Sequence, residues 1–216
     1  MPYGLIDNGR VPNSVQLSRP WRIHEIVPDF TLEDVWSLPV EGEREEFPRL
    51  LELAGSLDPA HSDSAATRFL WRLRDRLGAW FDLGRISVPA GAEAPKPRLP
   101  IPGTAEASLA GRLPADLRNT AAGQDFGSLP FRPLYRTELE AAAEISNQTV
   151  HGVAHLAWVE RGGGRYRGQM AVYVKPRGRF GHAYMAAIKP FRYLIVYPAL
   201  MRQIARRAAP EIQPPT

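Results

Sequence analysis

The sequence predicts a single α+β domain built on a curved antiparallel sheet with helices packed on one face. Two observations support this fold class. The second half of the chain holds consecutive segments rich in β-branched and aromatic residues, and helical periodicity occurs before and after them. The chain has 216 residues, of which 44% are hydrophobic and 23% are charged. This size and composition are typical of one globular domain with a sizeable core.

The beginning of the chain is predicted to contain one strand and two short helices. Residues 1–18 are polar and rich in turn residues, so we expect an N-terminal arm. Residues 21–27 alternate in polarity and favour a strand. Residues 31–36 begin with a capping threonine followed by acidic residues, which predicts a short helix. A second short helix is predicted to start near Pro48 and to end at Gly55.

The clearest helix of the first half is predicted at residues 64–81, where apolar residues recur every three or four positions. A proline-rich loop is expected at residues 84–103. We place this loop inside one domain, because the preceding residues hold a single strand, which is too little for an independent core. A short helix is expected at residues 114–120. The predicted domain spans residues 19–209 and is followed by a tail at residues 210–216.

Four consecutive strands are predicted in the second half, at residues 131–137, 141–147, 149–159 and 166–175. Three glycines between the last two strands predict a tight hairpin turn. Consecutive strands joined in this way form an antiparallel meander.

Residues 181–207 are predicted to form a long C-terminal helix that Pro190 and Pro198 break or kink. Its apolar residues, including Tyr193 and Tyr197, recur at helical steps. Two interpretations stay open for this stripe. It is either an apolar face packed against the sheet or, in part, the lid of a ligand cavity between helix and sheet.

Basic residues are concentrated in the C-terminal third of the chain. Residues 161–207 contain 11 Lys or Arg and no Asp or Glu, whereas the rest carries 16 basic and 23 acidic residues. This asymmetry favours an anionic partner, or simply the pairing of the two parts with each other. No nucleic-acid-binding motif accompanies the basic residues, so nucleic acid is not expected as a partner.

Several classes of chemistry are excluded by what the sequence lacks. There are no cysteines, which excludes disulfides, thiol nucleophiles and cysteine-ligated metals. No phosphate-binding loop, zinc-protease motif, EF-hand or nucleophile elbow is present, and no cofactor is expected. The chain shows neither a signal peptide nor an apolar run of about 20 residues. We therefore expect a cytoplasmic protein without a transmembrane segment.

Two histidines, His151 and His155, lie four residues apart on one face of a predicted strand. Their Cα atoms would be about 13 Å apart at the usual rise of a strand, which is too far for one shared metal ion. No metal site is therefore expected. The two side chains are either structural, hydrogen-bonded histidines or the polar points of a cavity.

Three glutamates, Glu138, Glu140 and Glu144, precede the histidines, and the last two share a strand face. A carboxylate that faces an apolar cavity has a raised pKa and serves as a general acid or base. The alternative is a solvent-facing strand surface. Tyr135, just before this cluster, is a comparable polar candidate.

Several stretches of the chain resemble the bacterial domain of unknown function 2867 family, over about residues 19–207. The resemblance implies a START-like (SRPBCC) helix-grip fold, in which a curved antiparallel sheet packs around a long C-terminal helix and encloses an apolar cavity. It also implies that the domain follows an NmrA-like short-chain reductase domain in some members, and it supplies no catalytic residues. The stretches that carry it are residues 28–30, 34–36, 132–136, 143–153, 169–176 and 184–201.

The sequence therefore leads us to expect a cavity protein that binds a small, mostly apolar or amphipathic molecule, with or without simple acid–base catalysis on it. The alternative is an interaction module whose basic C-terminal third docks onto an acidic partner, such as a reductase domain, or onto an anionic membrane. The candidate ligand-binding residues are Tyr135, Glu144, His151, His155, Tyr193 and Tyr197.

Overall fold

The computed structural model describes residues 9–56, 108–120, 131–146 and 150–208. The predicted helix at residues 64–81 and the proline-rich loop at residues 84–103 lie outside these ranges. Within the described ranges, none of the helices combines the length and the apolar composition needed to cross a lipid bilayer.

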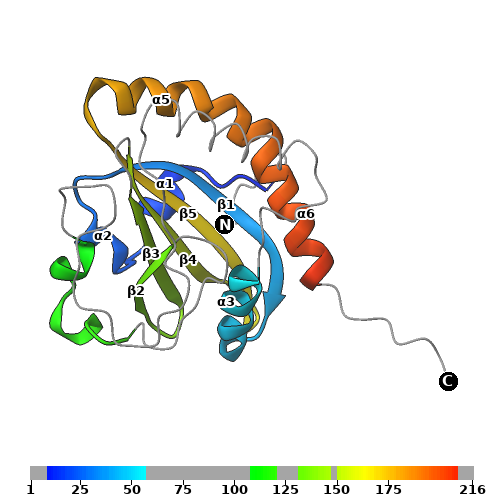
Figure 1. Cartoon of the computed structure of the whole chain (residues 1–216). Coiled ribbons are helices and arrows are strands. Elements are labelled where there is room, and N and C mark those ends of the chain that lie inside the picture. The colour runs from blue at the N-terminus through cyan, green and yellow to red at the C-terminus, as the bar shows by residue number, and fades with distance from the viewer. Residues whose placement is uncertain (1–8, 57–107, 121–130, 147–149, 209–216) are drawn as a thin grey trace.

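Five strands form one antiparallel sheet in the order β1-β5-β4-β3-β2 (Figure 1). The α+β class and the antiparallel sheet are thus confirmed. The four strands predicted between residues 131 and 175 correspond to β2 through β5, and the predicted glycine turn joins β4 to β5. The strands are β1 (Thr31–Gly42), β2 (Arg132–Arg136), β3 (Glu140–Ser146), β4 (Val150–Gly162) and β5 (Arg165–Pro176).

The first strand and the first helix were predicted in the wrong places. Residues 21–27 contain the helix α2 (Ile23–Ile26) rather than a strand. Ile23 and Ile26 are both fully buried, because one helical turn brings positions three apart to the same side. The helix predicted at residues 31–36 is instead the start of β1, which pairs with β5 along most of its length. This long-range pairing outweighs the local capping pattern.

The other helices before the C-terminal segment are short, and two of them lie where the sequence predicts a helix. α1 (Asn13–Leu17) lies within the predicted N-terminal arm. The helix predicted near Pro48 is α3 (Phe47–Gly55), which follows the turn η1 (Arg44–Glu46). The region predicted as a short helix at residues 114–120 contains one 3₁₀ turn, η3 (Ala115–Leu117), preceded by another, η2 (Leu109–Arg112).

The C-terminal segment is helical in three parts: α5 (Gly178–Phe191), the π-helical segment η4 (Arg192–Val196) and α6 (Tyr197–Ala208). Pro190 lies inside the last turn of α5, where it removes a backbone hydrogen-bond donor and favours a local change of helix type. Figure 1 shows the chain bending as it passes from α5 into α6. The expected disruption is therefore present between the two prolines, because η4 interrupts the α-helix after Pro190 and ends just before Pro198.

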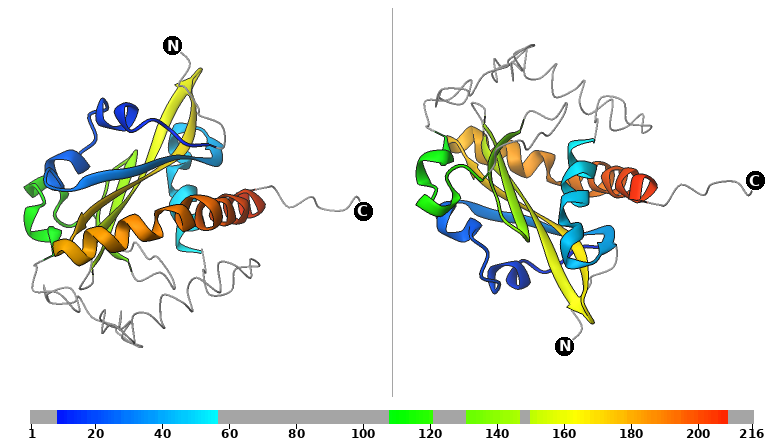
Figure 2. Two further views of the ribbon diagram at one scale, coloured as in Figure 1. Left: turned by 90° about the horizontal axis from the view of Figure 1, so that it is seen from above. Right: turned by 90° about the horizontal axis from the view of Figure 1, so that it is seen from below.

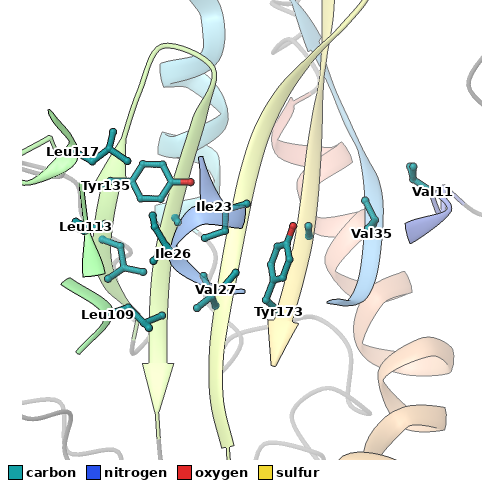
Figure 3. Close-up of a cluster of buried hydrophobic side chains, with 14 residues drawn as sticks. Val11, Ile23, Ile26, Val27, Val35, Leu109, Leu113, Leu117, Tyr135 and Tyr173 are labelled. Atoms are coloured by element: carbon teal, nitrogen blue, oxygen red, sulfur yellow. The ribbon is translucent and has the colours of Figure 1, made fainter. Parts of the chain in front are cut away.

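Helices cover both faces of the sheet, not one face as predicted (Figure 2). On what we call the α2 face, α1, α2, η2 and η3 pack against Ala142, Val153, Ala171 and Tyr173. Figure 3 shows this cluster, with Tyr135 and Tyr173 entering it from β2 and β5 on either side of α2. On what we call the α5 face, α3 and α6 pack against the opposite side chains of the strands, and α5 crosses the sheet.

Candidate functional site

A buried carboxylate lies at the centre of the α2 face. Glu140 is 4% exposed, and its Oε2 accepts hydrogen bonds from Nε2 of His155 at 2.8 Å and from the hydroxyl of Tyr135 at 2.9 Å. Its Oε1 accepts the backbone N–H of Arg22 at 2.9 Å, at the start of α2. His155 and Tyr135 are fully buried. The carboxylate thus joins three segments, β2, β4 and the start of α2.

The network continues from His155 toward the edge of the protein. Gln169 donates to Oε1 of Gln16 at 2.7 Å, which makes Nε2 of Gln16 the donor to Nδ1 of His155 at 3.1 Å and to the hydroxyl of Tyr173 at 2.9 Å. His155 therefore accepts at Nδ1 and donates at Nε2. The Tyr173 hydroxyl in turn donates to Nε2 of the half-buried His24 at 3.0 Å. These contacts give each of the five side chains at least one hydrogen-bond partner.

The pKa values of the network agree with these roles. Burial alone would raise the pKa of Glu140, but its hydrogen bonds from His155, the backbone and Tyr135 outweigh burial and hold the pKa below its ordinary value. Burial and the neighbouring carboxylate raise the pKa of Tyr135, and burial raises the pKa of Tyr173 to about 12. Burial and the adjacent His155 lower the pKa of His24. At neutral pH the network therefore contains an ionised Glu140, and Tyr135, Tyr173 and His24 are neutral.

A second buried pair lies farther along β3 and β4, on the same face of the sheet. Nε2 of His151 lies 3.0 Å from Oε2 of Glu144, and both side chains are almost fully buried. The Ser108 hydroxyl and the backbone N–H of Leu109 donate to the same carboxylate, the latter at 3.0 Å. Phe30 packs its edge against the histidine ring, with ring centroids 5.1 Å apart. This pair therefore anchors the start of η2 to β3 and β4.

Four of the six predicted site residues, Tyr135, Glu144, His151 and His155, thus belong to two closed networks on the α2 face. The prediction that Glu140 and Glu144 share one strand face is confirmed, and both are buried rather than solvent-facing. In the described ranges, no group of three or more histidine or acidic side chains is arranged to hold a metal ion. The hydrogen bonds of these networks hold the covering segments α2 and η2 against the sheet, which is a structural role.

The other two predicted residues, Tyr193 and Tyr197, meet at a third carboxylate on the α5 face. Asp34 of β1 is fully buried, and it accepts hydrogen bonds from Arg192, from the Tyr193 hydroxyl and, at 2.7 Å, from the Tyr197 hydroxyl. Trp36 stacks on Tyr197 with ring centroids 4.5 Å apart. Burial opposes the charge on Arg192, but Tyr197 and Asp34 outweigh it and raise the pKa of the guanidinium. η4 and the start of α6 are thereby tied to β1.

Next to this carboxylate, the middle of the sheet is incompletely covered. Asp34 pairs across the sheet with Val172, which pairs with Ala154, so all three point to the α5 face. Ala154 and Val172 are only half-buried, as are Met170 and Ile145 on the same face. On the α2 face of the same two central strands, Val153, His155, Ala171 and Tyr173 are at most 2% exposed. The two faces of the sheet therefore differ in how tightly they are closed.

α5 spans this part of the sheet and is held by hydrogen bonds close to both of its ends. Before it, Arg177 donates to the Ser146 hydroxyl at the end of β3 at 2.8 Å, and after it Arg192 binds Asp34 of β1. Its 14 residues extend about 20 Å, enough to cross from β3 to β1 at a strand spacing of about 4.8 Å. Among the side chains described in α5, Met185 is the one large apolar side chain that is buried.

Sequence reasoning missed Asp34, Arg192 and Gln16, which hold these arrangements together. Arg192 carried a usable signal, because a charged residue inside an apolar helical stripe requires a counter-charge when that stripe is buried. Asp34 was assigned to a helix start, which gave its carboxylate a capping role instead of a buried one. Gln16 lay in a segment predicted as an arm and carried no signal.

The fold and these sites define a protein with a five-stranded antiparallel sheet, closed on one face by polar networks and crossed on the other by a helix fastened at both ends. The chain belongs to the family described as protein of unknown function DUF2867, whose model matches residues 26–199. A search of curated proteins and a search of solved structures each found no match.

The network predicts that Glu140→Gln destabilises the protein by about 1–3 kcal/mol, because the new amide NH₂ meets donors that require an acceptor. Glu138→Gln is the matched control, since Glu138 is 81% exposed and forms one surface ion pair with Arg44. Urea denaturation of both variants measures the difference. Equal effects of the two substitutions would contradict the assigned role of Glu140.

The lowered pKa of His24 predicts a pH dependence of stability. Unfolded His24 takes up its proton near pH 6.5, whereas the folded protein does so only at lower pH. The unfolded state binds more protons in this window, so the free energy of unfolding falls as the pH drops below about 6.5. His24→Gln should flatten this part of the profile, and His182→Gln, at an exposed position, should not. A profile that is the same in both variants would rule out the contribution of His24.

Proposed function

We propose that this protein binds a small, mostly apolar molecule between α5 and the α5 face of the sheet. One observation carries the proposal: Ala154, Val172 and Met170 lie in the middle of the two central strands and yet are only half-buried. Central strands with helices on both sides are normally closed on both faces. We call these three residues the apolar floor. Among the side chains described in α5, Met185 is the one large apolar side chain that is buried, and an apolar floor under such a helix is the kind of site that takes an apolar ligand.

The size of the floor residues supports the same interpretation. Gly152 has no side chain, and a Cβ built there would lie 3.4 Å from Cγ2 of Ile145 and farther from every other neighbour. Packing against the described residues therefore does not demand a glycine at this position. Together with Ala154, it leaves room on the α5 face that larger strand residues would fill.

A polar group at one end of the ligand fits the edge of this floor. Trp36 is 5% exposed, and among the described residues its indole N–H is one of the few buried donors with no hydrogen-bond partner. It lies beside the cluster of Asp34, Tyr193 and Tyr197. An oxygen acceptor of the ligand, such as a carboxylate or a carbonyl, would satisfy this donor. We therefore propose an amphipathic ligand with one acceptor group.

The proposal is binding rather than catalysis. Glu140, Glu144, His151 and His155 lie on the opposite face of the sheet, and each is already hydrogen-bonded within the core. A general acid or base has to reach the proton that it transfers. A ligand on the α5 face would be separated from these side chains by the sheet itself.

A fluorescent fatty acid tests this proposal, because dansyl-undecanoic acid combines an apolar chain with one carboxylate. Ala154→Ile fills the floor and should weaken the binding of this probe by at least about tenfold. Ala183→Ile is the matched control, since Ala183 is exposed on the outer side of α5, and it should leave the affinity nearly unchanged. Urea denaturation checks that both variants fold. Equal affinity of both variants for the probe would contradict the proposed site.

The acceptor group is tested by Trp36→Phe, which keeps an aromatic ring but removes the indole N–H. We expect the affinity for dansyl-undecanoic acid to fall more than the affinity for the corresponding amine, since only the carboxylate accepts this hydrogen bond. Trp21→Phe is the matched control, because Trp21 also has a buried indole N–H without a partner but lies on the α2 face. A similar loss in both variants would contradict the role of Trp36.

A further inference from the structure

The outer surface of the C-terminal helices is apolar and basic. Leu194, at the bend between α5 and α6, is 77% exposed, which makes it the most exposed large hydrophobic residue among those described. The exposed basic residues along the two helices include Arg179 and Lys189 of α5 and Arg202 of α6, with Arg206 and Arg207 near the end of α6. No Asp or Glu occurs between residues 161 and 207. We call this surface the outer helix surface.

The exposed residues of α5 lie along one side of the helix. Ala183, Ala187 and Pro190 recur at steps of four and three residues, which places them on a common side, and all are exposed. The buried Met185 lies on the opposite side of the helix. The outer side of α5 is therefore a low ridge of small residues that leads to Leu194.

The positive charge of the outer helix surface disfavours a second copy of the chain as its partner and favours an anionic one. Two copies of the chain that met through the outer helix surface would bring Arg179, Lys189 and Arg202 of both copies together, which is unfavourable. A negatively charged partner is attracted by the same residues. The basic residues are spread over both helices instead of clustered, which suits an extended anionic surface better than a single anionic group. An isolated leucine enters the interface of a bilayer without needing a matching pocket.

We infer that the outer helix surface adsorbs reversibly onto an anionic lipid bilayer, with Leu194 inserted among the lipids and Arg179, Lys189 and Arg202 at the level of the headgroups. This inference does not depend on the ligand proposed above, because it concerns the side of α5 that faces away from the sheet. In binding of this kind, the basic residues attract the bilayer at a distance, and the inserted apolar side chain holds the protein on it. Such binding is therefore sensitive to both salt and lipid charge.

Sedimentation with lipid vesicles tests the inference on the full chain. We expect binding to vesicles of phosphatidylglycerol and phosphatidylcholine, little binding to phosphatidylcholine alone, and a steep loss of binding between about 0.1 M and about 0.5 M salt. Lys189→Glu and Arg202→Glu should each weaken the partition at least about fivefold. Leu194→Ser should weaken it at either salt concentration, because it removes the inserted side chain.

Matched controls lie elsewhere on the molecule. Leu17→Ser alters the other exposed large hydrophobic residue, which is 58% exposed on α1, and Arg165→Glu alters an exposed charge next to the β4–β5 turn. Both variants should bind vesicles like the unaltered protein. Equal losses in the control and test variants would overturn the inference. So would binding to poly-glutamate without binding to anionic vesicles, which would indicate an acidic protein as the partner.

Discussion

The buried carboxylate of Asp34 is the interaction on which the course of the C-terminal helices depends. A fully buried charge is stable only when it is paired and hydrogen-bonded, and Asp34 obtains its partners from Arg192, Tyr193 and Tyr197. The irregularity in β1 between Leu32 and Asp34 brings this carboxylate into register with Val172 of β5. Because the three partners follow α5 directly, this carboxylate also determines where α5 leaves the sheet.

The two faces of the sheet use buried polar groups differently. On the α2 face, the networks around Glu140 and Glu144 join β3 and β4 to α1, α2 and η2, and both oxygens of the Glu140 carboxylate are hydrogen-bonded. Fully satisfied networks of this kind rigidify a core. On the α5 face, the polar contacts lie near the two ends of α5, and apolar residues between them remain partly exposed. The α2 face thus gives the sheet a rigid support, and the proposed ligand binds on the opposite α5 face.

The sheet was largely predictable from the sequence, whereas the grouping of the site residues was not. The strands after residue 130 follow one another through short turns, so local patterns sufficed. β1 pairs with β5 from more than 100 residues away, and its local pattern of Thr31 to Asp34 favoured a helix instead. The sequence left open whether the six candidate residues face solvent, the core or a cavity. Their division between two faces depends on strand register, and no pattern in the sequence showed that Arg192 would meet Asp34.

The most direct test of the central claim, that an apolar molecule binds between α5 and the sheet, is a titration followed by methionine methyl NMR. The chain has four methionines, of which Met170 lies on the floor, Met185 is a buried residue of α5 and Met201 lies on α6. With undecanoic acid as the ligand, the account predicts shifts and intermolecular NOEs for the methyl groups of Met170 and Met185, and none for Met201. Binding that leaves Met170 and Met185 unshifted would contradict it.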